Sequence, residues 1–106
     1  MEKLIRDGKV AVLISGGYGA GWYSWHGIEE LLFDPNVIAM LENPDDDEDL
    51  SSIIHYCLEK YGEDEYYGGV DGLRVVWVEQ GRRFFIEEFD GAEVIRYENE
   101  QVWLTA

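Results

Sequence analysis

The stretch from Val10 to Gly27 constrains the fold of this chain more than any other. It begins with the apolar run VAVLI, residues 10–14, in which three of five residues are β-branched. Such a run is typical of a strand that is covered on both faces or lies centrally in a sheet. Four glycines follow between positions 16 and 21, and with them come four aromatic residues: Tyr18, Trp22, Tyr23 and Trp25. We therefore expect a buried strand that leads directly into a glycine-rich aromatic loop.

Two interpretations of this loop remain open from the sequence. In the first, the glycine backbone offers N–H groups to an anion and the aromatic rings stack on a base or sugar, so that the loop binds a ligand. The predicted ligand-binding residues of the loop are Gly17, Tyr18, Gly19, Gly21, Trp22, Trp25 and His26. In the second, the aromatic side chains fold inward as a structural lid, and the glycines only permit the bend.

Arg82 or Arg83 is expected to supply positive charge for such a ligand. Arginines are concentrated in the C-terminal third of the chain, whereas its middle carries only Lys60. If Arg82 or Arg83 folds toward the glycine loop, its guanidinium provides the charge that a phosphate requires. The alternative is that these arginines pair with neighbouring glutamates across strands.

The sequence contains no recognisable cofactor or catalytic motif. Compared with G-x-G-x-x-G, the third glycine comes one residue early, and neither the helix nor the acidic residue of that motif follows at its usual place. His26, His55 and Cys57 lack metal-binding spacing, and Ser15 lacks the G-x-S-x-G context of a nucleophile. We therefore predict no metal site and no cofactor, and we favour a non-enzymatic protein.

The charge balance limits the expected partners. The 106 residues include 23 acidic and 8 basic side chains, which give a net charge of −15 at pH 7. This charge repels nucleic acid and anionic membranes, so neither is expected as a direct partner. A single cysteine allows no internal disulfide and is typical of the cytoplasm. Neither a signal peptide nor a membrane-spanning run is predicted.

The remaining pattern predicts a single α+β domain over residues 1–106, with a mostly antiparallel sheet and two or three short helices packed against it. Asp7-Gly8 predicts a hairpin turn between strands. Helices are expected over residues 35–42, where Asp34-Pro35 forms the start, and over residues 50–61, where Gly62 forms the stop. One or two further helical turns are expected over residues 28–33.

The C-terminal third predicts strands. Alternation and turn residues from Leu73 onward indicate a meander of antiparallel strands over 73–79, 82–89 and 92–98, with a last short strand over 101–104. The second glycine- and tyrosine-containing loop, residues 63–72, is expected to connect helix to sheet beside the first loop. The acidic run DDDED, residues 45–49, is interpreted as a solvated helix entrance, with an acidic contact surface or a cation site as the alternative.

The chain also resembles a group of small uncharacterised proteins encoded by tailed bacteriophages and some bacteria. The resemblance is carried by LIRDGKVAVLIS at residues 4–15, GYGAGW at 17–22 and the tryptophan that follows at 25. Further support comes from LLFDPNVIAMLE at 31–42 and GLRVVWVEQGRRFFIEEFDG at 72–91. The resemblance implies a phage accessory protein in the cytoplasm of the bacterial host, and it carries no activity that can be transferred.

Two functions of different class follow from these observations. The first is a non-enzymatic binding protein that sequesters a small nucleotide-like ligand in the glycine and aromatic loop, as an antagonist of host defence. The second is an acidic protein that mimics nucleic-acid phosphates and inhibits a basic host protein. The loop favours the first function and the composition favours the second. Both are compatible with a homo-oligomer.

Overall fold

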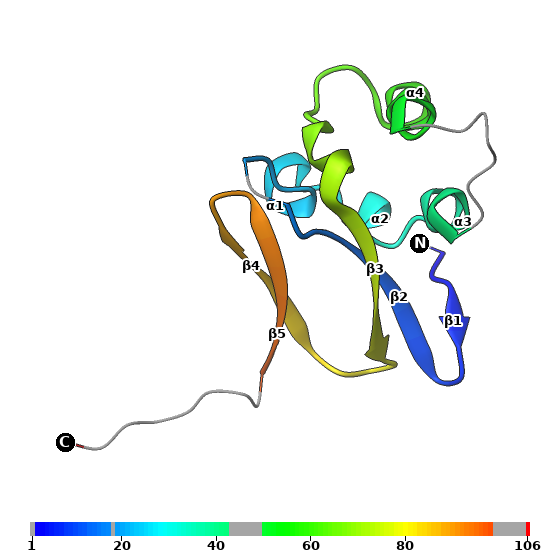
Figure 1. Ribbon diagram of the computed structural model, residues 1–106. Coiled ribbons are helices and arrows are strands. Elements are labelled where there is room, and N and C mark those ends of the chain that lie inside the picture. Colours follow the sequence, from blue (N-terminus) through cyan, green and yellow to red (C-terminus); the bar gives the residue numbers. More distant parts are fainter. Residues whose placement is uncertain (1, 18, 43–49, 99–105) are drawn as a thin grey trace.

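The computed structural model describes residues 2–17, 19–42, 50–98 and 106 of the chain. The described strands form two antiparallel sheets, a three-stranded sheet in the order β1-β2-β3 and the hairpin β4-β5 (Figure 1). This arrangement with short helices confirms the predicted α+β class. The strands are β1 (Ile5–Arg6), β2 (Lys9–Ser15), β3 (Leu73–Glu79), β4 (Phe84–Phe89) and β5 (Ala92–Tyr97). The helices are α1 (Tyr23–His26), α2 (Glu29–Leu32), α3 (Pro35–Glu42) and α4 (Leu50–Tyr61), with a 3-10 helix, η1 (Gly68–Gly72).

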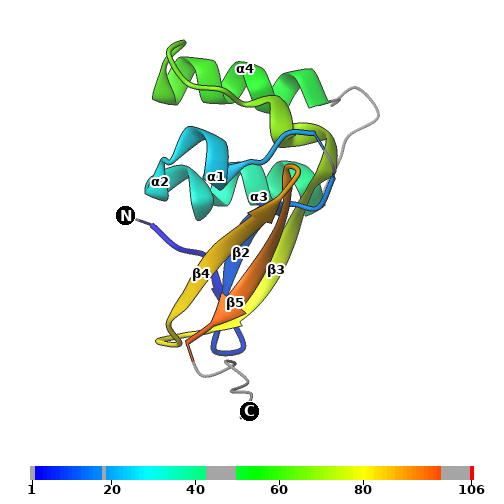
Figure 2. The ribbon, with the colours of Figure 1, turned by 90° about the vertical axis from the view of Figure 1, so that its left-hand side faces the viewer.

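The apolar run at residues 10–14 forms the central strand, β2, as predicted. Ala11 and Leu13 face a core that includes Val37 of α3 and Cys57 of α4. The opposite face of β2 packs on α2 and on the β4-β5 hairpin, with a core of its own that contains Val12. The three-stranded sheet thus has α3 and α4 on the side of one core, and α2 with the hairpin on the side of the other; in Figure 2 the hairpin lies in front of β2 and β3. Full burial of one such aliphatic side chain contributes about 1.5–3 kcal/mol, so this strand anchors both cores.

Local signals place the first hairpin and the helix ends as predicted. Asp7 and Gly8 both adopt positive φ, 51° and 76°, which suits a two-residue turn between β1 and β2. Asp34 caps α3, because its Oδ1 accepts the backbone N–H of Asn36 at 2.8 Å. Helix α4 ends before Gly62, whose φ of 101° stops it. The DDDED run and the strand expected over 101–104 lie outside the described residues.

The cap residue Asp34 also ties α3 to α4. Its Oδ2 accepts the hydroxyl of Tyr56 at 2.8 Å and that of Tyr61 at 2.5 Å. Lys60 Nζ lies 3.3 Å from the same oxygen. Burial raises the pKa of the Asp34 carboxyl, but these hydrogen bonds and the Lys60 charge outweigh burial and hold that pKa below its usual value.

The predicted meander after Leu73 is wrong at its first step. Strand β3 pairs with β2 from Ser15↔Leu73 to Lys9↔Glu79, whereas β4 pairs with β5 in the second sheet. The chain turns tightly after β3, where the N–H of Arg82 donates to the carbonyl of Glu79 at 3.0 Å, but β3 and β4 then lie in different sheets. Alternation identifies a strand but carries no information about its partner.

Candidate binding site at the glycine loops

The two glycine-rich loops, residues 16–21 and 63–72, pack together, as the sequence predicted; we call them the glycine loops. The N–H of Gly16 donates to the carbonyl of Gly72 at 2.9 Å. A Cβ at Gly69 would collide with the carbonyl group of Gly21. The two backbones therefore meet at a separation that only glycine permits.

The turn of the β4-β5 hairpin closes against the first glycine loop. The N–H of Gly19 donates to the carbonyl of Asp90 at 2.6 Å. Gly91 has a φ of 86°, and a Cβ there would collide with the backbone N of Ala20. Three segments that are distant in sequence thus build one backbone-lined region.

Glu93 on β5 holds this region together, a role that the sequence alone did not indicate. The residue is fully buried. Its carboxylate accepts the N–H of Ser15 at 2.8 Å, and the N–H and hydroxyl of Ser24 at 2.7 Å each. One feature of the sequence did point to its burial. Side chains alternate between the two faces of a strand, so Glu93 lies on the same inward face of β5 as Ile95. By contrast, the expected cross-strand pairing holds for Arg96, whose Nε lies 2.9 Å from Glu87 Oε2.

A cavity of about 300 Å³ lies between the glycine loops. Its size is at the lower end of the range for small-molecule or side-chain pockets. Backbone makes up much of its lining, together with the side chains of Ser15, Tyr66 and Asp71. Among the described residues that line it, Asp71 is the one charged side chain. The cavity therefore favours a neutral or cationic group over a phosphate.

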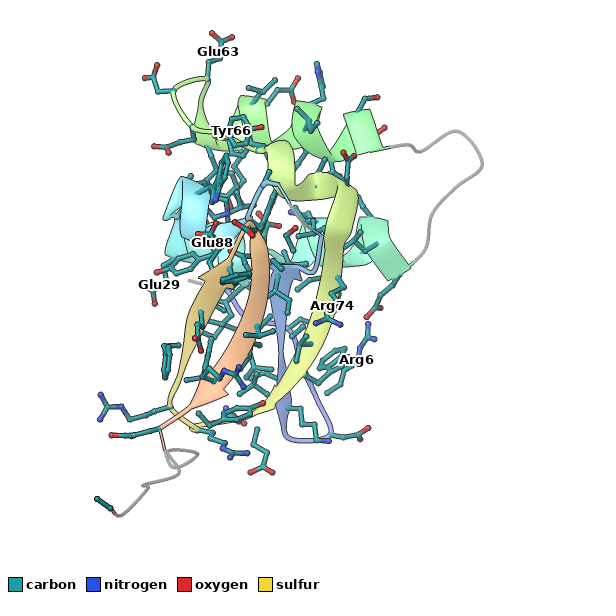
Figure 3. All side chains as sticks on the ribbon, turned by 60° about the vertical axis from the view of Figure 1, so that its left-hand side comes forward. Arg6, Glu29, Glu63, Tyr66, Arg74 and Glu88 are labelled. Carbon is teal, nitrogen blue, oxygen red and sulfur yellow. The ribbon has the colours of Figure 1, made fainter. Side chains whose placement is uncertain are left out.

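An exposed aromatic pair stands beside this cavity. The rings of Trp25 and Tyr66 lie 5.0 Å apart, and the two residues are 43% and 52% exposed. Trp25 is fixed by Glu88, whose Oε1 accepts the indole N–H at 2.8 Å. The same carboxylate oxygen accepts the N–H of Gly91 at 3.1 Å. Figure 3 shows Tyr66 and Glu88 on the side of the molecule away from Arg6 and Arg74.

The other aromatic residues of the first loop turn inward. Trp22 is 0% exposed and His26 is 5% exposed, and their rings pack edge to face at 5.1 Å. His26 Nδ1 accepts the N–H of Ile28 at 2.8 Å, and burial lowers the pKa of His26 to about 4. Neither ring presents a face to a ligand. Trp22 and His26 thus fold inward as the lid interpretation expected, whereas Trp25 lies at the surface.

The predicted arginines do not join this site. Arg82 lies with its guanidinium carbon 3.7 Å from the centre of the Tyr97 ring. Arg83 Nη1 lies 3.5 Å from Glu98 Oε1. Both arginines follow the turn after β3, which lies at the opposite end of the sheets from the glycine loops (Figure 1). Of the other predicted residues, Gly17 and Gly19 line the cavity, Gly21 packs against Gly69, and Tyr18 lies outside the described residues.

Cys57 is buried, and burial raises the pKa of its thiol to about 12, so it is not a nucleophile at neutral pH. Within the described ranges, histidine, cysteine and acidic side chains do not gather in threes as a metal ion requires. No helix in the described part of the chain has the length and apolar character needed to cross a membrane.

Comparison with protein-family models, with curated proteins and with solved structures found no match to this chain.

Proposed function

We propose that this protein is a non-enzymatic binding protein that captures a basic segment of a partner protein at the glycine loops. One observation carries the proposal: Trp25, which Glu88 holds, forms an exposed aromatic pair with Tyr66 beside a cavity to which Asp71 contributes negative charge. Aromatic faces next to carboxylates suit a guanidinium or ammonium group. Of the two functions that the sequence left open, this is the acidic-protein alternative, with the glycine loops as its contact site.

The energetics agree with an arginine or lysine anchor. A cation over an exposed aromatic ring contributes about 0.5–1 kcal/mol, and about 2 kcal/mol or more when the contact excludes water. In addition, the net charge of −15 attracts a basic partner over long range and increases the association rate at low salt.

A nucleotide-like ligand in this cavity has less support. The Asp71 carboxylate would repel a phosphate bound there. Neither Arg82 nor Arg83 is among the described residues that line the cavity, so neither offsets that repulsion. In the phage setting that the resemblance implies, the partner is a basic protein of the bacterial host, and its capture opposes a host function such as defence.

A fluorescence titration tests the proposal. A short arginine-rich peptide is added to the protein, and tryptophan emission is followed at low and high salt. We expect a saturable change at low salt that Trp25→Ala removes and that Trp77→Phe, on β3, retains. Binding should weaken as salt rises, because the contact joins opposite charges. A titration without saturation, or an equal response from Trp25→Ala and the parent protein, would contradict the proposal.

A further inference from the structure

A second hollow, of about 490 Å³, lies between α2 and β4. We call it the basic groove, because Lys3, Arg82 and Arg83 line it. The residues that line it are entirely different from those that line the cavity at the glycine loops. It is therefore a separate site, and an inference about it goes beyond the function proposed above.

Positive charge is concentrated in this groove against the overall charge of the chain. Three of the 8 basic residues of the protein line it. Among the described lining residues, Glu29 on α2 is the one carboxylate. The side chain of Arg83 is 82% exposed. Lys3 Nζ stands 4.6 Å from the centre of the Phe33 ring, so its ammonium group is held at the groove wall. The groove is a local cationic site on an acidic surface.

Aromatic rings also line the basic groove. Phe33 and Phe84 pack edge to face at 6.3 Å and line the groove with Leu32. Phe85, the next residue along β4, also lines the groove and is 54% exposed. An exposed phenyl ring next to guanidinium groups is suited to stacking a base while the arginines bind a phosphate.

We propose that the basic groove binds a mononucleotide, with its base against Phe85 and its phosphate against Arg83 and Lys3. The volume suits one nucleotide, because ligand pockets of about 300–1,000 Å³ hold small molecules. A nucleic-acid strand would extend past the groove onto a surface of net charge −15, which repels its phosphates. The charge pattern therefore selects a single nucleotide over a polymer.

The adjoining hollow on the other side of β4 does not offer the same chemistry. It measures about 510 Å³ and shares Arg83, Phe84 and Phe85 with the basic groove. Glu87 and Glu98 line it as well, and Glu98 Oε1 lies 3.5 Å from Arg83 Nη1. The arginine that it adds, Arg96, is paired with Glu87 at 2.9 Å. Arg96 consequently serves as a matched control for Arg83, because it lies nearby and carries the same charge.

Calorimetric titration with ADP tests the inference, with adenosine and inorganic phosphate as separate probes. We expect ADP to bind with a dissociation constant of about 100 µM or lower, and each fragment to bind at least about tenfold more weakly. Arg83→Ala and Lys3→Ala should each weaken ADP binding by about tenfold, while Arg96→Ala leaves it unchanged. Phe85→Ser, at an exposed position, should weaken binding with the melting temperature retained.

Three results would overturn the inference. They are an absence of saturable heat with ADP, an equal loss in Arg83→Ala and Arg96→Ala, and tighter binding of a single-stranded oligonucleotide than of ADP. The third result would assign the groove to nucleic acid. Trp25→Ala should leave ADP binding intact, so failure of the peptide-binding proposal and failure of this inference are distinguishable.

Discussion

The carboxylate of Glu93 accepts two hydrogen bonds from Ser24, one from the backbone N–H and one from the hydroxyl, each at 2.7 Å. Its other oxygen accepts the N–H of Ser15 at 2.8 Å. A single fully buried side chain on β5 thus joins the end of β2 to helix α1. The position of the hairpin, and with it that of Glu88 and Trp25, depends on this carboxylate.

Glu93→Ala should therefore lower the free energy of unfolding by about 2–4 kcal/mol, because it leaves the buried N–H of Ser15 and the partly buried N–H of Ser24 without their acceptor. Ser24→Ala removes only the hydroxyl bond and should lower it by about 1 kcal/mol. Urea denaturation followed by circular dichroism measures both values. Equal losses in the two variants would show that Glu93 does not organise the loop.

The buried imidazole of His26 should make stability depend on pH. Its pKa is lowered to about 4 in the folded protein, whereas an unfolded histidine titrates near 6.5. The unfolded chain thus takes up the proton first, so stability is full above about pH 6.5 and falls as the pH drops toward 4. Between pH 7 and pH 5 we expect a loss of about 2 kcal/mol.

Urea midpoints measured at pH 7 and pH 5 test this dependence. His26→Asn removes the titrating group and should flatten the profile in that window. His55→Asn serves as the control, because the His55 side chain is exposed and pairs with Glu59 on the same helix. A wild-type midpoint that stays constant from pH 7 to pH 5 would rule out the buried neutral His26. Asp34 affects stability in a different pH range. Because its pKa is lowered in the folded protein, its contribution to stability is lost only as the pH falls through that lowered pKa.

Gly69→Ala should separate the glycine loops. A Cβ at this position would collide with the backbone of Gly21, which cannot rotate away as a side chain can. We expect a loss of about 1–3 kcal/mol in stability and a weaker response to the arginine-rich peptide. Gly17→Ala is the matched control, because its Cβ would meet Gly72 at 3.6 Å, an ordinary contact. If both variants melt at the same temperature as the parent protein, the close packing of the two loops would be refuted.

Glu88→Gln should weaken peptide binding more than Glu87→Gln does. Both changes remove one negative charge from β4, but Glu88 also holds the indole N–H of Trp25, whereas Glu87 pairs with Arg96 on the other face. We expect about a threefold to tenfold weaker binding for Glu88→Gln and a change of less than about twofold for Glu87→Gln. The fluorescence titration at low salt measures both. Indistinguishable affinities would mean that only overall charge matters.

Elements with a local cause were predictable from the sequence. The turn at Asp7-Gly8, the cap and proline at Asp34-Pro35 and the stop at Gly62 each depend on the φ preference or side-chain reach of a few adjacent residues. The apolar run at residues 10–14 likewise predicted a strand covered on both faces, because a continuous apolar run requires burial on both sides.

The candidate site was only half predictable, because its parts come from separate segments. Glycines at residues 16–21 indicated a close approach, but the partner backbone at Gly69 and Gly72 became known only from the fold. Trp22 and Trp25 have the same residue type and lie three positions apart, yet one is buried and the other is 43% exposed. Their different exposure depends on how α1 meets the core and the hairpin, which no local preference determines.

The sequence by itself determined the secondary structure near each turn and cap, the central place of β2 and the acidic character of the protein. The tertiary structure decided the partner of β3, the burial of Glu93, and the separation of Arg82 and Arg83 from the glycine loops. The physical reason is that backbone preferences act between near neighbours, whereas strand pairing and the solvation of a carboxylate depend on which distant segments pack around them.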